Sequence, residues 1–205
     1  MLFNSIEFIF FFPIVVIIYY ALPKKVSYLW LLFASYYFYM KWNPIYVLLL
    51  FGVTGITYIA GLKIQSSRKK KADRKKGTNI FIVCVFICLV VLFFFKYFEF
   101  GLSYINKLFC ILHISSIEWN YSILLLVGIS FYIIQALGYI IDVYRGEIGA
   151  ERNFFRYALF ISFFPQLVAG PIERSKNLLK QLYILPKFSI ENLKNGYLLM
   201  LWGFF

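Results

Sequence analysis

The sequence GISFYIIQALGYIIDVYRG, residues 128–146, determines how the rest of this chain is interpreted. It is apolar enough to cross a bilayer, yet it contains a glutamine and ends close to an aspartate. Residues spaced by four and three positions lie in one stripe on an α-helix, and here that stripe is Gly128, Tyr132, Gln135, Tyr139 and Asp142. We predict a helix whose stripe lines a polar passage. The alternative is that Gln135 forms one bond between helices and Asp142 only ends the span at the membrane surface.

A second stretch, FFPQLVAGPIER at residues 163–174, interrupts an apolar run with Pro165 and Gln166 and then breaks at Gly170-Pro171. Proline disfavours a helix interior by about 3 kcal/mol, so the stretch predicts a broken or kinked helix. A broken helix would direct free N–H groups and the positive end of its dipole toward an anionic or carbonyl group. Arg174 would then bind a phosphate or carboxylate through two N–H groups. Alternatively, the helix is only kinked and Arg174 extends to lipid phosphates.

Composition favours an integral membrane protein, because 62% of the residues are hydrophobic and only 15% are charged. Soluble domains are about 45–50% apolar, and a quarter of their residues are charged. The net charge of +12 comes from basic residues between apolar spans. That distribution is typical of cytoplasmic loops and gives no indication of nucleic-acid binding. The cysteines have no metal-ligand spacing, so we predict no metal site.

We expect an all-α, polytopic transmembrane protein forming a single membrane domain over residues 1–205. The expected spans are about 2–22, 26–40, 45–62, 80–95, 122–141 and 157–169, with another beginning at 195–205. A run of Lys and Arg at 63–79 predicts a cytoplasmic loop, which places the N-terminus outside the cytoplasm. The N-terminal apolar segment has no basic start and no cleavage site, so it is expected to be a retained span.

Four segments carry further expectations. The tyrosines of Ser35–Tyr39 are expected at the membrane interface, and Lys96–Tyr121 on the outer face. Residues 157–169 are short for a crossing, so this segment either crosses or re-enters. Residues 171–185 predict an interfacial amphipathic helix that begins at Pro171.

Together, the two quoted motifs resemble the membrane-bound O-acyltransferase family, in the bacterial branch of alginate O-acetylation and teichoic acid D-alanyl transfer proteins. The resemblance also includes the apolar N-terminus, the basic segment near residue 70 and the final GYLLMLWGFF. The family's catalytic histidine lies in a later membrane segment than any present here. The chain is therefore expected to be the N-terminal portion of such a protein, without turnover when isolated.

The resemblance implies transfer of an acyl group, often acetyl, from a cytoplasmic thioester donor across the lipid bilayer. The donor would be acetyl-CoA or an acyl-carrier protein. The acceptor would be a hydroxyl of an exported polysaccharide, a wall polymer or an extracytoplasmic relay protein. No bound cofactor is expected. The resemblance assigns no catalytic residue to this chain, and its candidate tunnel residues are Tyr132, Gln135, Tyr139, Asp142, Pro165, Gln166, Gly170, Pro171 and Arg174.

Two other classes of function remain open from the residues alone. A transporter or flippase also places polar residues and broken helices at mid-membrane. A non-catalytic assembly subunit would use the stripe to bind a partner helix. The single histidine, His113, lies outside the family's motif positions, so it is not assigned as a catalytic base. The basic run 63–79 either sets topology alone or also docks an acidic donor protein.

Overall fold

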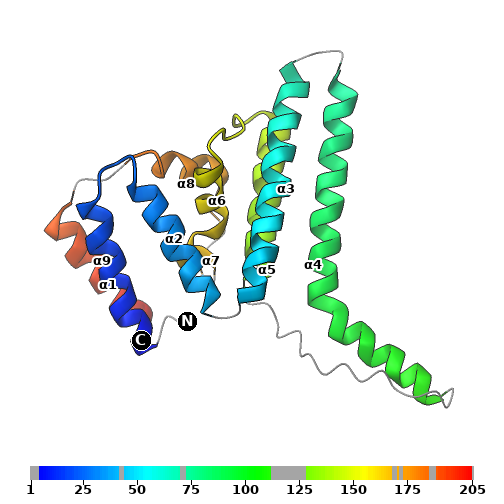
Figure 1. Ribbon diagram of the computed structural model, residues 1–205, viewed down its shortest axis with the longest axis horizontal. Helices are drawn as coiled ribbons and strands as arrows, with labels where there is room; N and C mark the ends of the chain where they lie inside the picture. The colour runs from blue at the N-terminus through cyan, green and yellow to red at the C-terminus, as the bar shows by residue number, and fades with distance from the viewer. Residues whose placement is uncertain are drawn as a thin grey trace.

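The computed structural model describes residues 5–41, 44–69, 73–111, 128–167, 170, 173–184 and 188–204. All of its regular elements in these ranges are α-helices, as the sequence predicts (Figure 1). In chain order they are α1 (Ile6–Ala21), α2 (Ser27–Met40), α3 (Pro44–Lys69), α4 (Arg74–Ile111), α5 (Ile129–Arg145), α6 (Phe154–Ser162), α7 (Phe164–Leu167), α8 (Ser175–Gln181) and α9 (Ile190–Phe204).

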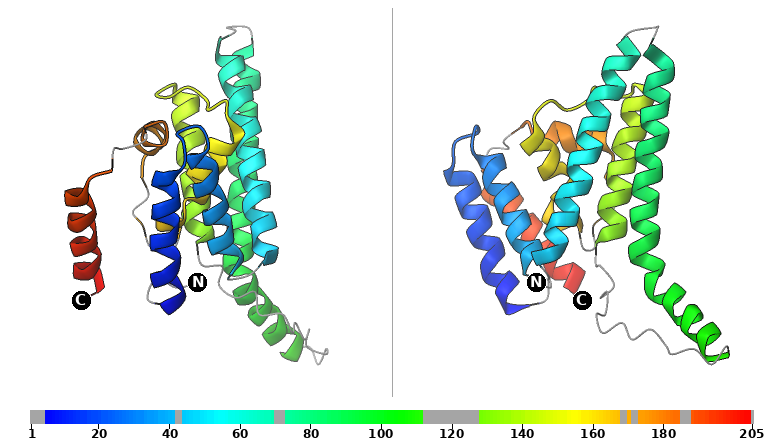
Figure 2. Two further views of the ribbon diagram at one scale, coloured as in Figure 1. Left: turned by 60° about the vertical axis from the view of Figure 1, so that its left-hand side comes forward. Right: turned by 45° about the vertical axis from the view of Figure 1, so that its right-hand side comes forward.

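The helices form two groups joined by a short broken segment. Helices α3, α4 and α5 pack against one another, and α1 packs against α2. The broken segment α6–α7 lies between the groups, because α6 contacts α2, α3, α5 and α8 (Figures 1 and 2). Helix α6 therefore connects the two groups, together with the direct contact between α2 and α3.

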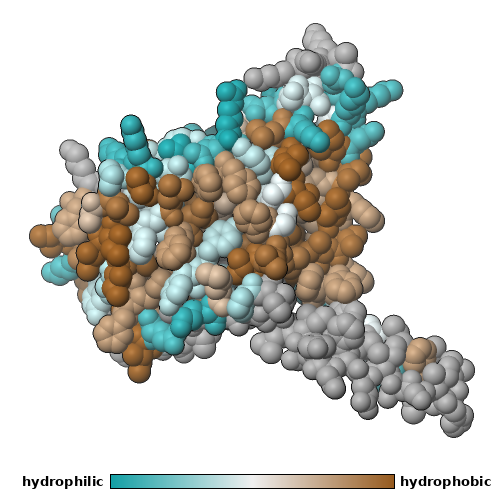
Figure 3. Space-filling model, viewed as in Figure 1, coloured by the Kyte–Doolittle hydropathy of each residue, from teal (hydrophilic) through white to brown (hydrophobic). Residues whose placement is uncertain are grey.

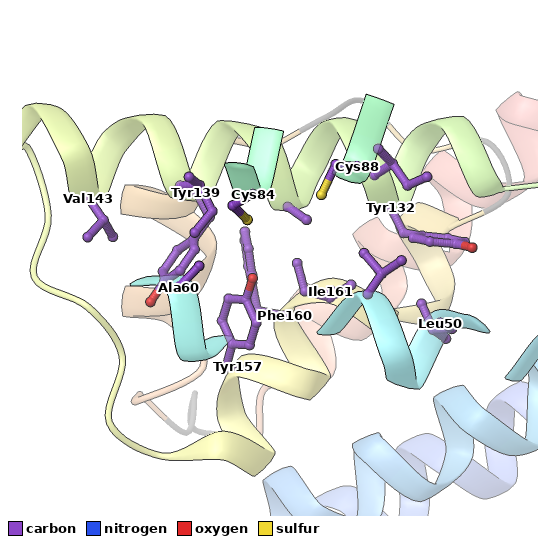
Figure 4. Packing of buried hydrophobic residues seen from close by; sticks show 14 of the residues in the cluster. Leu50, Ala60, Cys84, Cys88, Tyr132, Tyr139, Val143, Tyr157, Phe160 and Ile161 are labelled. Atoms are coloured by element: carbon purple, nitrogen blue, oxygen red, sulfur yellow. The ribbon is translucent and has the colours of Figure 1, made fainter. Parts of the chain in front are cut away.

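The main hydrophobic core lies where α3, α4, α5 and α6 meet (Figure 4). The ring centroids of Tyr139 from α5 and Tyr157 from α6 are 4.6 Å apart. The Tyr157 hydroxyl donates to Oγ1 of Thr57 at 2.8 Å, so its polar end is satisfied inside the core. Cys84 and Cys88 of α4 are buried and unoxidised, consistent with small packing side chains.

On the face that Figure 3 shows, hydrophobic residues cover a broad band. In α4, Phe86 and Phe93 are 65% and 67% exposed. Two helical stretches within the described residues, Val47–Arg68 and Arg74–Tyr97, are long and apolar enough to cross a membrane. Ile6–Ala21 is a shorter apolar helix. Exposed phenylalanines on so long a helix are unfavourable in water and favourable in lipid, which supports a membrane location.

The predicted loop at 63–79 is wrong. Helix α3 continues to Lys69 and α4 begins at Arg74, so most of residues 63–79 are helical. Lysine and arginine are good helix formers, and the two helices remain in contact beyond their apolar parts. A Cβ added to Gly77 would lie 3.1 Å from the Cβ of Ser67. The basic residues nevertheless gather at this end of the helix pair.

Other boundaries also differ from the predictions. Helix α4 runs through Lys96 to Ile111 rather than ending near 95 (Figure 1). The expected start of the fifth span at 122 lies outside the described residues, and α5 ends at Arg145. Helix α9 begins at Ile190, before the expected 195. The tyrosine-rich stretch of α2 is also partly internal, since Ser35 and Tyr39 are buried.

The amphipathic helix after the broken segment is shorter than predicted. Helix α8 begins at Ser175 with Arg174 as its N-cap, and Pro171 lies outside the described residues. Its apolar side chains Leu178 and Leu179 join the main core, so α8 packs on protein. An apolar side spaced for a membrane surface also fits a protein surface, and the α5–α6 pair provides one here.

Gly146 provides the first testable prediction. Its φ of 81° ends α5 in the left-handed region, and an added Cβ would overlap the guanidinium of Arg68. That group donates from Nη1 to the Val143 carbonyl at 3.4 Å. We expect Gly146→Ala to lower the free energy of unfolding by about 1–2 kcal/mol or more. Thermal unfolding in detergent measures this effect.

The matched control is Gly52→Ala. Gly52 lies inside α3, and nothing lies within 4 Å of its added Cβ. Alanine is the better helix former, so this change is expected to leave the unfolding midpoint unchanged or raise it. Equal midpoints for the two variants would contradict the role given to Gly146.

Candidate functional site

A polar cavity of about 310 Å³ lies along α5, against the segment that leads into α8. Helix α5 contributes one face and its last turn, and residues 173–175 form the opposite side. The complete lining consists of Ile134, Gln135, Gly138, Tyr139, Asp142, Arg145, Glu147, Glu173, Arg174 and Ser175. The mixture of apolar and charged groups is typical of a binding site.

The stripe on α5 faces the protein interior, as the spacing predicts. Tyr132, Gln135 and Tyr139 are each 6% exposed or less, and Asp142 is half-buried. Gly128 precedes the helix with a φ of 93°, which glycine adopts readily. The stripe therefore directs its polar groups at α6, α7 and the segment before α8.

The broken segment explains why α5 needs a glutamine. An unbroken helix would join the Phe160 carbonyl to the Phe164 N–H, but Phe163 has a ψ of 107° and interrupts the helix. Gln135 Nε2 instead donates to the Phe160 carbonyl at 2.8 Å. The Phe164 N–H donates to Oγ of Ser35 in α2 at 3.3 Å. The Phe160 carbonyl and the Phe164 N–H, which the break separates, are thus satisfied by side chains of neighbouring helices.

Tyr139 secures the connection between α5 and α6. Its hydroxyl accepts from the Glu151 N–H at 2.9 Å. The ring lies close to α3, since an added Cβ on Gly61 would be 3.0 Å from Tyr139 Cε1. A larger residue at position 61 would move the ring, and the cavity wall would move with it.

The charged end of the cavity brings together three carboxylates and two guanidinium groups. Asp142 accepts a hydrogen bond from the Ser175 hydroxyl, which fixes the start of α8 against α5. Arg145 pairs with Glu147 at 3.9 Å, and Asn177 donates to Glu173 at 3.0 Å. Arg174 forms no ion pair among the described residues, so its N–H groups are available to a ligand.

The structure brings together some of the predicted site residues and separates others. Gln135, Tyr139, Asp142 and Arg174 line the cavity. Tyr132 lies in the core away from it, and Pro165 lies in α7.

Gln166 supports Gln135, accepting from its Nε2 at 3.4 Å. Gly170 packs on Gln166, with 2.6 Å between an added Cβ and the Gln166 Cα. Pro171 and His113 lie outside the described residues.

Sequence reasoning missed Ser175 and Glu173 as lining residues, and also Ser35 as a support for the break. The signal for Ser175 was its place beside Arg174 at the start of a helix. The partner of Ser35 is 129 residues away in the sequence, so no local pattern could identify it. Arg145, one turn after Asp142, could have been inferred from helical spacing.

Gln135→Leu tests whether the glutamine is required by the helix break. Leucine has a similar volume, but it leaves the buried Phe160 carbonyl without a donor. We expect the free energy of unfolding to fall by about 1–3 kcal/mol. The control is Ile134→Leu, because Ile134 is 42% exposed on the same turn of α5. A Gln135→Leu midpoint equal to that of the control would show that the contact contributes nothing.

Comparison with curated proteins finds relatives along most of the chain. Probable alginate O-acetylase AlgI of Pseudomonas aeruginosa is 39% identical over 184 residues, or 88% of this chain and 34% of that protein. The protein of the same name from Azotobacter vinelandii is 36% identical over 182 residues, 88% of this chain and 36% of that one. Peptidoglycan O-acetyltransferase of Helicobacter pylori is 32% identical over 178 residues, 75% of this chain and 32% of that one.

The chain spans about a third of the length of these relatives. No protein-family model matches it, and no solved structure is significantly similar. Identities of 35–39% along about nine tenths of the chain nevertheless agree with the motifs on α5 and after α6. Over the region that it shares with these relatives, the chain is similar to the alginate O-acetylases, which confirms the resemblance that its motifs predict.

Proposed function

We propose that this chain forms part of a membrane O-acetyltransferase that acetylates hydroxyl groups of an exported polysaccharide or wall polymer. The observation that carries the proposal is the similarity to alginate O-acetylases along about nine tenths of the chain. The relative named for peptidoglycan O-acetylation supports a polysaccharide acceptor in general rather than alginate alone. A relay protein on the far side of the membrane is the other acceptor consistent with this chemistry.

The polar cavity gives the chain a role in that reaction. Its charged end lies at the start of α8, on the same side as the adjoining ends of α3 and α4 (Figure 1). We assign this side to the cytoplasm, where a thioester donor such as acetyl-CoA or an acyl-carrier protein would arrive. Arg174 would bind the donor's carbonyl or phosphate oxygens through its N–H groups. Asp142, held by Ser175, would keep the wall of the cavity in place beside it.

The membrane placement follows from the same geometry. Helices α3 and α4 would cross the bilayer, with their apolar surfaces toward lipid and their basic ends in the cytoplasm. The break between α6 and α7 would lie within the protein, where Gln135 and Ser35 satisfy its backbone. Non-helical backbone at membrane depth is tolerated only under such conditions. This arrangement leaves a polar route along α5 for the acyl group.

Deleting the complete gene in its source organism tests the proposed activity. We expect ester-linked acetate on the exported polysaccharide, released by mild alkali, to fall to background and to return with the wild-type gene. Asp142→Ala and Arg174→Ala are expected to restore at least tenfold less acetate, because each removes a charged group from the cavity. Unchanged acetate in the deletion strain would reject an O-acetyltransferase.

Lys176→Ala serves as the matched control for the two cavity variants. Lys176 is an exposed cation in α8 that does not line the cavity. It is expected to restore wild-type acetate at equal protein abundance, measured by immunoblotting of membranes. A loss as large as that of Arg174→Ala would show that surface charge, rather than the cavity, determines activity.

Cysteine labelling tests the proposed topology. Ser66 and Ser103 are exposed residues toward opposite ends of the α3–α4 pair, in α3 and α4 respectively. In a variant lacking Cys110, an impermeant maleimide should label Ser103→Cys in intact cells. The same reagent should reach Ser66→Cys only after the cells are permeabilised. The reverse pattern would place the basic ends of α3 and α4 outside the cytoplasm.

A further inference from the structure

A second, smaller cavity lies about the start of α6, away from the candidate site. Its lining comes from the end of α1, the turn into α2, the first turn of α6 and residues 182–184. Arg156 of α6 and Lys24 of the α1–α2 turn contribute two positive charges to it. Tyr28 and Tyr183 also line it, and neither aromatic ring has a role in the proposed acyl transfer.

Arg156 is held in place in a way that leaves its Nε hydrogen-bond donor unused. Its guanidinium carbon lies 4.0 Å from the ring centroid of Tyr183 and 5.0 Å from that of Tyr28. These ring contacts fix the group without requiring a polar acceptor. The Nε atom is buried and has no hydrogen-bond partner among the described residues. A buried donor of this kind is costly unless a ligand or water satisfies it.

The nearby carboxylate does not neutralise this arginine. Both oxygens of Glu151 accept from the Tyr183 hydroxyl, at 2.8 and 2.7 Å, and Oε1 also accepts from the Asn153 N–H at 2.9 Å. No ion pair joins Glu151 to Arg156 in the described part of the chain, and Lys24 has none there either. Burial and the hydrogen bond to Glu151 raise the pKa of Tyr183, and a hydrogen bond from the Arg156 side chain lowers it. The Tyr183 hydroxyl remains the donor to Glu151.

The size and position of the cavity restrict its ligand. Its volume is about 20 Å³, which accommodates roughly one water-sized oxygen atom. The ligand must therefore insert only its oxygen atoms and leave the rest of the molecule outside. The cavity lies at the end of the apolar helix α1, which stops at Ala21 and is followed by the exposed Lys24 and Lys25. Such a position corresponds to the level of lipid headgroups.

We propose that Arg156 and Lys24 form a binding site for a phosphate group, supplied by the headgroup of an anionic phospholipid. Arginine matches phosphate oxygens with a fork of N–H donors, and lysine adds a mobile charge beside it. Two cations line the cavity, and the carboxylate of Glu151, which accepts from Tyr183 and Asn153, is not part of its lining. This charge balance favours an anionic lipid over a zwitterionic one. The bound lipid would join the α1–α2 group to α6, the element that contacts both helix groups.

The experiment uses the full chain in maltoside detergent, without phosphate, and measures the thermal unfolding midpoint. The probes are dioctanoyl phosphatidylglycerol, inorganic phosphate and dioctanoylglycerol, which lacks the phosphate. We expect phosphatidylglycerol to raise the wild-type midpoint and dioctanoylglycerol to leave it unchanged. The rise should be lost in Arg156→Gln and reduced at least twofold in Lys24→Gln. An equal rise of the unfolding midpoint in the wild type and in both variants would overturn the proposed phosphate site.

Lys25→Gln is the matched control, since Lys25 is the exposed neighbour of Lys24 and does not line the cavity. It should retain the full wild-type rise. Lys24 is also exposed, so Lys24→Gln should fold normally. If Arg156→Gln fails to fold, Lys24→Gln alone still tests the site. A rise with inorganic phosphate that equals the lipid effect and disappears in Arg156→Gln would overturn the lipid source while supporting the phosphate site.

Discussion

Two backbone groups at the break between α6 and α7 determine much of this architecture. The Phe160 carbonyl and the Phe164 N–H would bond to each other in a continuous helix. Because Phe163 interrupts the helix, Gln135 and Ser35 take their places as partners. In an apolar surrounding, an unsatisfied backbone group costs several kcal/mol, so the break is possible only where α2 and α5 both supply a polar side chain.

This requirement orients α5 and, through it, the polar cavity. Gln135 must face the break, so Tyr139 and Asp142, one and two turns further along, face the same side. Tyr139 then accepts from the Glu151 N–H and Asp142 from the Ser175 hydroxyl. The passage that we propose for an acyl group and the support for a broken helix would therefore use the same stripe, so the two interpretations offered by the sequence are compatible.

Periodicity and composition predicted the helices and the inward-facing stripe, because both depend on residues close together in the chain. The boundaries were less accurate where charged residues continue a helix: Lys63–Lys69 is helical, although its charges suggested a loop. Long-range partners were beyond local patterns. Ser35 accepts from the Phe164 N–H, and Arg156 in the first turn of α6 lines the same cavity as Lys24. Both contacts arise because the fold brings distant segments of the chain together.

A polar passage along α5 requires water in the cavity beside this helix, while α4 faces lipid. Spin labels at Gly138→Cys and Phe86→Cys, in a variant without Cys110 and reconstituted in liposomes, test this directly by electron paramagnetic resonance. Gly138 lines the cavity, and Phe86 is 65% exposed on α4. The label at 138 should collide mainly with a water-soluble nickel chelate, and the label at 86 mainly with oxygen. Oxygen-dominated collisions at both positions would contradict a polar passage.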